Sequence, residues 1–241
     1  MDSFVYGDDN ARIVLLQPMG EHDPDVAERE ITLIREHTAE DFRLVAFRIR
    51  DWNKELSPWK NPAVFGKEDF GDGAAKTLGE IMKLCDDISK TYYIGGYSLA
   101  GLFALWAAYQ TDLFQGIAAA SPSVWFPGFT EYMKEHDIRS RHVYLSLGDK
   151  EEKTRNPVMA TVGDRIRTAH DLLVKRQVDC VLEWNEGNHF RDTDLRTARA
   201  FIWVINRKEA EGKDLKRKYQ KRHERDNKII NESHDLCSRL I

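Results

Sequence analysis

The sequence of 241 residues has only three cysteines, Cys85, Cys180 and Cys237. They are widely spaced and form no C-x-x-C pair, which excludes a disulfide framework and a cysteine-based zinc site. Three scattered thiols fit a reducing compartment. The first ten residues, MDSFVYGDDN, lack a basic segment followed by an apolar one, so we expect no cleaved signal peptide and a cytoplasmic protein.

Long apolar runs and a strong excess of one charge are also absent. No segment approaches the roughly 18 apolar residues that span a bilayer, so a membrane protein is not expected. The net charge is −4 and the isoelectric point about 6.1, so nothing in the overall charge predicts a nucleic-acid partner. With 41% hydrophobic and 32% charged residues, the chain is typical of a globular protein.

Short apolar runs alternate with segments of helical periodicity. The runs that we predict as strands are residues 12–16, 42–49, 92–94, 117–120, 142–147 and 178–184. The first predicted helix begins at residue 23 or 24. Three more cover residues 75–88, 99–110 and 159–173, and the last runs from Thr193 as N-cap to Ile205. Strands separated by helices predict an α/β fold, with a mostly parallel sheet and helices on both faces. A binding or catalytic site is then expected at the carboxyl ends of the strands.

The charge changes near the carboxyl end. Residues 207–241 hold 11 lysines and arginines against 7 acidic residues. We therefore predict a folded domain over residues 1–206 and a charged tail, helical or partly disordered, over residues 207–241. The tail is either solvated, or it is a docking helix or a contact between copies of the chain, since it carries Ile229, Ile230 and Leu236 near its end. A homo-oligomer through the tail is thus one alternative.

Residues 92–106, YYIGGYSLAGLFALW, predict a strand, a tight turn and a buried helix. Ser98 stands at the turn, two residues after Gly96 and two before Ala100. A serine at such a turn requires small neighbours, because larger side chains would collide with the adjoining backbone. The helix N-terminus favours negative charge that develops beside the hydroxyl. The pattern indicates a nucleophilic serine, and the alternative is a serine that only caps the helix.

This segment resembles the nucleophile elbow of α/β-hydrolases. More narrowly, GGYSLAGLFALWAA followed by SPSVWF is similar to the esterase group that includes enterochelin esterases, esterase D and the mycolyltransferases. The resemblance covers residues 10–206 and implies an α/β-hydrolase fold without a large lid domain. Only 11 residues precede Arg12, so the antiparallel strands usual at the edge of this family's sheet are expected to be short or missing.

A serine nucleophile needs a base, and a base needs an orienting carboxylate. His189 follows the last predicted strand in the loop WNEGNHF, where Gly187 allows the loop to turn. The strand between the serine and the histidine leads into GDKEE, which supplies the acid. The pattern of the fold, G-x-x-[DE], favours Glu151, while Asp149 and Glu152 stay open as alternatives.

The resemblance also implies an oxyanion hole. Its donors are the backbone N–H of Leu99 and one from the turn Gln17–Gly20, where Met19 aligns best. Two aromatic residues, Trp125 after a predicted strand and Trp52 in the long loop 50–73, are expected to line a substrate pocket. The alternative is that these aromatic rings only anchor the loop.

We therefore predict a serine esterase that acts on a small-molecule ester or thioester, with no cofactor and no metal. Two alternatives remain open. One is an acyltransferase with the same three side chains, and the other is a binding protein of the same fold without catalysis. The natural substrate is not readable from the sequence.

Overall fold

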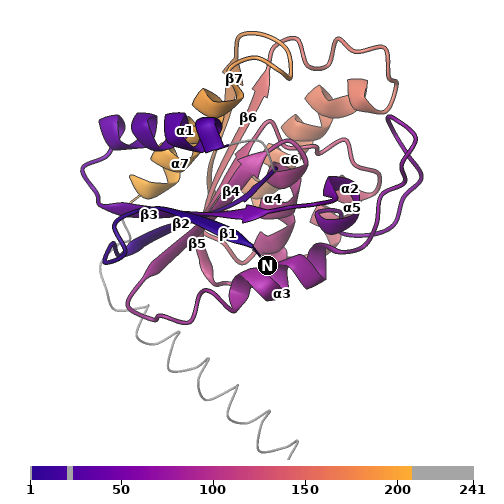
Figure 1. The fold of residues 1–241 in the computed structure, drawn as a ribbon. Helices are drawn as coiled ribbons and strands as arrows, with labels where there is room; N and C mark the ends of the chain where they lie inside the picture. Colours follow the sequence, from indigo (N-terminus) through magenta and orange to yellow (C-terminus); the bar gives the residue numbers. More distant parts are fainter. Residues whose placement is uncertain (1, 21–23, 208–241) are drawn as a thin grey trace, which may run out of the picture. The chain divides into compact units, whose positions relative to one another are not determined.

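The computed structural model describes residues 2–20 and 24–207, and Figure 1 shows their arrangement. Seven strands form one sheet, in the order β1-β3-β2-β4-β5-β6-β7. The strands are β1 (Ser3–Gly7), β2 (Ile13–Met19), β3 (Phe42–Arg48), β4 (Thr91–Tyr97), β5 (Phe114–Ala120), β6 (His142–Gly148) and β7 (Asp179–Asn185). Only the β1–β3 pair is antiparallel; the other pairs in this sheet are parallel.

The strand order reverses at β2, which lies between β3 and β4. After β2 the chain forms β3 on one side of this strand and then crosses over to form β4 on its other side. The helices that follow β2 and β4 therefore diverge, and the carboxyl ends of these two strands form the switch point at which open α/β sheets bind their ligands. Met19 ends β2 and Ser98 directly follows β4, so both lie at this reversal.

Helices cover both faces of the sheet, as predicted. The main helices are α1 (Pro24–His37), α3 (Ala74–Met82), α4 (Leu99–Gln110), α6 (Val162–Lys175) and α7 (Thr193–Ile205). Side chains alternate along a strand, so neighbouring residues of β2 enter different cores. Leu15 packs in the core with α1 and α7, whereas Leu16 packs in the core with α3, α4 and α6. The mostly parallel α/β architecture is thus confirmed.

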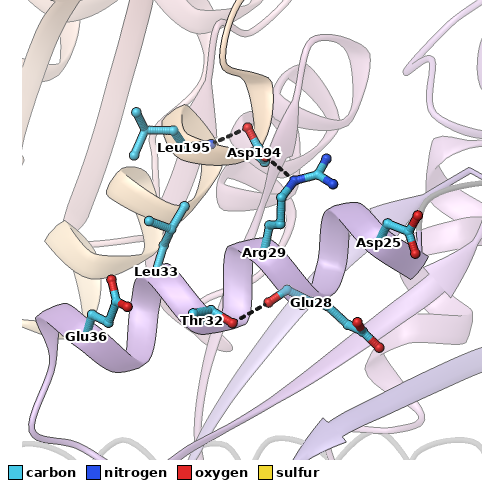
Figure 2. A pocket seen from close by; sticks show the side chains of 8 residues that line it. All are labelled: Asp25, Glu28, Arg29, Thr32, Leu33, Glu36, Asp194 and Leu195. Carbon is cyan, nitrogen blue, oxygen red and sulfur yellow. Dashed lines mark hydrogen bonds and ion pairs between the residues drawn. The ribbon is translucent and has the colours of Figure 1, made fainter.

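Helices α1 and α7 lie side by side on one face, as Figure 2 shows. The Nε–H of Arg29 donates to a carboxylate oxygen of Asp194 at 2.6 Å. An open groove of about 630 Å³ lies at this contact, with Asp25, Glu28 and Glu36 along its α1 side. The ion pair joins the two helices near the start of α7, directly after the loop that carries His189.

Three short elements have no counterpart among the predicted ones. They are β1, the four-residue helix α2 (Trp52–Glu55) inside the long loop, and α5 (Phe129–Glu135). A 3₁₀ turn, Met159–Thr161, precedes α6. Elements of this length carry too few residues to show a period in the sequence. β1 is the one short antiparallel strand at the sheet edge.

The boundaries of three predicted helices are wrong. The helix predicted over residues 159–173 begins as a 3₁₀ turn, is α-helical from Val162 and ends at Lys175. The helix over residues 75–88 ends at Met82, and Ile88 lies exposed beyond it. There the Asp87 carboxylate accepts hydrogen bonds from the N–H and hydroxyl of Ser89, a local turn that competes with a helix. At α7, Asp192 rather than Thr193 occupies the N-cap position, with a positive φ of 53°.

The tail predicted over residues 207–241 lies outside the described residues from residue 208 onward, so its proposed role in oligomers stays a prediction. The division into residues 1–206 and the tail stays a prediction as well. Within the part of the chain that the structure describes, no helix has the length and apolar character needed to cross a bilayer.

Candidate active site

Ser98 stands in the sharp turn between β4 and α4. Its φ of 58° and ψ of −118° lie in a region that costs a non-glycine residue about 1–3 kcal/mol. Three backbone hydrogen bonds hold this conformation. The Ser98 N–H donates to the carbonyl of Ala120 at 3.1 Å, and the Ser98 carbonyl accepts from the N–H groups of Leu102 and Ser123, both at 3.0 Å. A strained residue held from both sides is typical of functional sites.

The small residues around the turn are required by contact. A Cβ atom at Gly96 would lie 2.6 Å from the Cβ of Ala100, closer than two carbon atoms approach. A Cβ at Gly101 would lie 2.9 Å from the carbonyl oxygen of Gly96. The strand and helix therefore pack directly against each other across the turn, which supports the sequence argument for small neighbours of Ser98.

His189 comes from the loop between β7 and α7 and reaches Ser98 across 91 residues of sequence. Its Nε2 lies 2.9 Å from Ser98 Oγ, and its Nδ1 lies 2.6 Å from Glu151 Oε2. An ionised Glu151 accepts from Nδ1–H, so Nε2 of a neutral ring is the acceptor for the serine hydroxyl. Gly187, at a φ of 109°, turns the loop that presents the ring.

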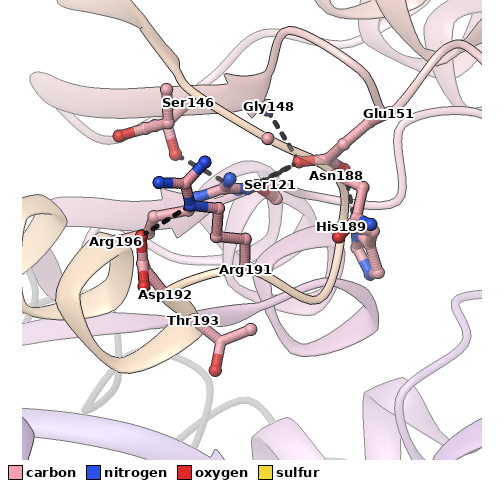
Figure 3. Close-up of polar contacts among 12 residues, drawn as sticks. Ser121, Ser146, Gly148, Glu151, Asn188, His189, Arg191, Asp192, Thr193 and Arg196 are labelled. Carbon is pink, nitrogen blue, oxygen red and sulfur yellow. Dashed lines mark hydrogen bonds and ion pairs between the residues drawn. The ribbon is translucent and has the colours of Figure 1, made fainter.

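Glu151 follows β6 and its side chain is 4% exposed. Oε2 faces His189, while Oε1 accepts from the Gly148 N–H at 2.7 Å and from the Ser121 hydroxyl at 2.8 Å (Figure 3). Burial alone would raise the pKa of Glu151. The hydrogen bond and charge of His189, with the bonds from Gly148 and Ser121, outweigh burial and hold this pKa below its ordinary value. The carboxylate is therefore ionised at neutral pH.

The two alternative carboxylates serve other contacts. Asp149 accepts the N–H of Gly187 at 2.7 Å, which ties the loop after β6 to the loop of His189. Glu152 lies 3.6 Å from the guanidinium of Arg167, near the surface. Of the three acidic residues that the sequence leaves open, the structure brings Glu151 to the histidine.

Leu99 and Met19 lie at neighbouring strand ends. Leu99 begins α4, and the first N–H groups of a helix have no partner within it. Met19 is the last residue of β2, and its carbonyl accepts from the N–H of Ile49 at 2.9 Å. The register Leu16↔Ile94 places the ends of β2 and β4 at the same edge of the sheet. Their use as oxyanion donors stays a prediction.

The predicted pocket residues are largely engaged in packing. The buried ring of Trp125 contacts Phe65 and Phe70 of the long loop edge-on, with ring centroids 5.9 and 6.2 Å away. Trp52 begins α2 and packs partly buried against the core. These contacts anchor the long loop, the role that the alternative interpretation gives to the aromatic residues. A role for Trp125 and Trp52 in substrate binding stays a prediction.

Four further residues at the site were not assigned a role from the sequence. Ser123 Oγ lies 3.2 Å from Ser98 Oγ, and Tyr97 donates its hydroxyl to the carbonyl of His189 at 2.8 Å. Phe190, 85% exposed, places its ring 5.5 Å from that of His189. Arg196 is buried beside Glu151. Ser123 and Phe190 stand next to predicted site segments, whereas an arginine in an amphipathic helix gives no sequence signal of burial.

Metal ligands do not gather in the described ranges 2–20 and 24–207. There, no group of three or more His, Cys, Asp or Glu side chains is arranged to hold a metal ion. The polar groups at the site are instead the serine hydroxyls, the imidazole, the carboxylate and the guanidinium described above. This set of groups can transfer a proton from a hydroxyl and stabilise the resulting imidazolium.

Comparison with known proteins finds no matching family model and no matching curated protein. Solved structures do match. An IroE-like serine hydrolase from Shewanella oneidensis superposes with a TM-score of 0.67 at 15% identity, covering 83% of this chain and 74% of that one. The siderophore hydrolase EstA from Aspergillus nidulans gives 0.59 at 19% identity, with 83% and 85% covered. A Bacillus cereus carboxylesterase gives 0.56 at 14% identity, with 85% and 93% covered.

The chain has the α/β-hydrolase fold. At these identities the likeness is one of fold, and it confirms the α/β-hydrolase fold that the sequence predicted. In an α/β-hydrolase the turn after the central strand is the nucleophile elbow, and Ser98 occupies this turn here. The chain order of Ser98, Glu151 and His189 is also that of α/β-hydrolases.

Proposed function

We propose that this protein is a serine esterase that hydrolyses a small-molecule ester or thioester through an acyl-enzyme. The observation that carries the proposal is the continuous contact from Ser98 Oγ to His189 Nε2, at 2.9 Å, and from His189 Nδ1 to Glu151 Oε2, at 2.6 Å. Both distances lie within hydrogen-bond reach, the geometry that a nucleophile and its base require.

In the first half of the reaction, Ser98 Oγ attacks the ester carbonyl carbon while its proton passes to His189 Nε2. The carbonyl oxygen becomes an oxyanion, for which the backbone N–H groups of Leu99 and Met19 are the proposed donors. The C–O bond of the ester, or the C–S bond of a thioester, then breaks. His189 gives its proton to the leaving alcohol or thiol, and the acyl group stays on Ser98.

In the second half, a water molecule attacks the acyl carbon and gives its proton to His189. The intermediate collapses to a carboxylic acid, and the proton returns to Ser98 Oγ. Glu151 stays ionised through both halves, where it orients the ring and stabilises the imidazolium that forms twice. The lowered pKa of Glu151 supports this role.

The names of the structural neighbours support an ester as the substrate. They include siderophore hydrolases, a ferulic acid esterase and a carboxylesterase. Aromatic side chains add to this support. Phe190 is exposed beside His189, and Phe65 is exposed on Trp125, which follows Ser123 by two residues. We therefore propose a small ester with an apolar or aryl group as the substrate class.

Replacing the nucleophile tests the proposal. Wild type is expected to hydrolyse a p-nitrophenyl ester and to be labelled at Ser98 by a fluorophosphonate. Ser98→Ala should lose at least about 10³-fold in kcat and all of the label, because the base then has no nucleophile to activate. Thermal unfolding of the variant controls for its fold. Unchanged turnover in Ser98→Ala would refute the assignment. Product analysis with and without an added alcohol separates hydrolysis from acyl transfer.

A further inference from the structure

Arg196 is the largest fully buried side chain among the described residues, with 1% of it exposed. It lies in the first turns of α7, a helix whose other buried residues are apolar or small. Removing a guanidinium from water is costly unless charged and polar partners replace the water. The contacts of this one side chain therefore show what its burial serves.

All the contacts of the Arg196 guanidinium lead to the candidate active site. Nη1 donates to Glu151 Oε1 at 2.9 Å and to the hydroxyls of Tyr97 and Ser121 at 3.1 and 3.3 Å. Nη2 donates to the carbonyl of Glu186 at 3.1 Å, in the loop that carries His189. One rigid, planar group thus spans the acid and the loop of the base.

The two carboxylate oxygens of Glu151 have different partners. Oε1 accepts from Arg196, from the Gly148 N–H and from the Ser121 hydroxyl, whereas Oε2 faces His189. Three donors on one oxygen prevent the carboxylate from rotating. The remaining oxygen is then held toward Nδ1 of the imidazole.

A second path runs from Arg196 to the histidine itself. Tyr97 accepts a hydrogen bond from Arg196 and donates its own hydroxyl to the carbonyl of His189 at 2.8 Å. Burial raises the pKa of Tyr97, so its hydroxyl keeps the proton that this bond needs. Its ring also lies against the imidazole, with the centroids 5.1 Å apart.

We propose that Arg196 is a positioning residue that fixes Glu151 and the His189 loop relative to each other, so that the imidazole stays aligned with Ser98. The proposal rests on the proposed function, because the aligned pair is taken to activate Ser98. Arg196 itself touches neither the nucleophile nor the reacting carbonyl. Its effect on the reaction passes through Glu151 and, by way of Tyr97, through His189.

The first test compares two replacements. Arg196→Met removes the charge and the donors at similar length, and Arg196→Lys keeps the charge but loses the planar fork. On a p-nitrophenyl ester we expect kcat to fall about 10- to 100-fold in Arg196→Met and less in Arg196→Lys, with KM nearly unchanged, because misalignment affects the reaction and not binding. Arg199→Met is the matched control, since Arg199 lies one turn later in α7 with 47% of its side chain exposed. It should keep wild-type kcat.

A double-mutant cycle separates positioning from general stability. If Arg196 acts mainly through Glu151, the kcat loss from Arg196→Met should shrink to about fivefold or less in a Glu151→Gln background. The same factor in both backgrounds would overturn the proposal, as would wild-type kcat in a folded Arg196→Met. If Arg196→Met does not fold, the kcat values of Tyr97→Phe and Arg196→Lys test the proposal instead. Each should lower kcat at constant KM, and wild-type kcat in both contradicts the proposal.

Proton NMR tests the inference without any activity. The Nδ1 proton of His189 lies in a short hydrogen bond to a carboxylate and should resonate far downfield in wild type and in Arg199→Met. In Arg196→Met, or in Arg196→Lys if that variant alone folds, the signal should shift or disappear. An unchanged signal there overturns the proposal. A protein with no esterase activity that still shows this difference would contradict the proposed function and leave the positioning role of Arg196 standing.

Discussion

The hydroxyl oxygens of Ser123 and Ser98 lie 3.2 Å apart, and Ser123 is 1% exposed. The Ser98 hydroxyl donates to Nε2 of His189, so Ser123 is the donor in the pair of hydroxyls. The backbone N–H of Ser123 donates in addition to the carbonyl of Ser98. Ser123 therefore holds both the backbone and the side chain of the candidate nucleophile.

Ser123→Ala should slow the reaction without changing binding. Loss of one hydrogen bond to Ser98 is worth about 0.5–1.5 kcal/mol, which predicts a fall in kcat of about 2- to 10-fold at constant KM. Ser140→Ala is the control, because the Ser140 hydroxyl is buried and donates to the carbonyl of Phe114, at the opposite end of the sheet. Equal kcat values in Ser123→Ala and wild type contradict the prediction.

The three acidic residues after β6 should differ sharply in their effect on kcat. Glu151→Gln is expected to lose about 10³- to 10⁴-fold, because the neutral amide no longer orients the ring and stabilises the imidazolium. Asp149→Asn should lose far less, since it weakens one contact to Gly187. Glu152→Gln should match wild type. Steady-state rates of the three variants check this order, and a larger loss in Asp149→Asn than in Glu151→Gln would show that the acid is misassigned.

The lowered pKa of Glu151 predicts how stability depends on pH. The ionised carboxylate is favoured in the folded chain, so its contribution to the free energy of unfolding is complete above the ordinary pKa of 4.5 and is lost as pH falls through the lower folded value. The difference in unfolding free energy between wild type and Glu151→Gln should therefore shrink below about pH 4.5. Urea titrations at several pH values measure this difference, with the half-buried Glu152→Gln as the control. If the difference in unfolding free energy between wild type and Glu151→Gln grows as the pH falls, the prediction is wrong.

Gly96→Ala should destabilise the fold at the nucleophile turn. The added Cβ would lie 2.6 Å from the Cβ of Ala100, and relieving such overpacking in a buried strand costs about 1–3 kcal/mol. Gly79→Ala is the matched control, because a Cβ at this exposed position in α3 meets nothing within 4 Å. It should raise the stability by up to about 1 kcal/mol. Urea unfolding measures the free energy of unfolding of both variants, and equal values for the two would contradict the prediction.

Phe190→Ala should weaken the binding of esters that carry an apolar or aryl group. The ring is 85% exposed beside His189, so a substrate bound at Ser98 is expected to cover part of it. Losing about 1 kcal/mol of apolar contact predicts a rise in KM of about fivefold with kcat nearly unchanged. Val174→Ala serves as the control, since Val174 is exposed near the end of α6, away from the strand ends that carry the site. An unchanged KM in Phe190→Ala would exclude this contact.

Much of the fold could be predicted because its main elements are long and periodic. The helix α4 has the predicted bounds, and β3 and β6 differ from the predicted strands by a single residue. Short elements such as α2 and α5 could not be predicted, because they span only one or two helical turns, too few for a repeated apolar pattern to be recognised. The burial of Arg196 could not be predicted either, since its partners lie in β4 and in the loops that follow β5, β6 and β7.

The sequence by itself determined the α/β architecture and the tight serine turn, because hydrophobic period and the size of adjoining residues act over a few positions of the chain. It also limited the acid to three neighbouring carboxylates. Only the tertiary structure decided which of them meets His189. That choice depends on how β6 and β7 align and where Arg196 of α7 points, and such long-range packing brings together residues that are far apart in the sequence.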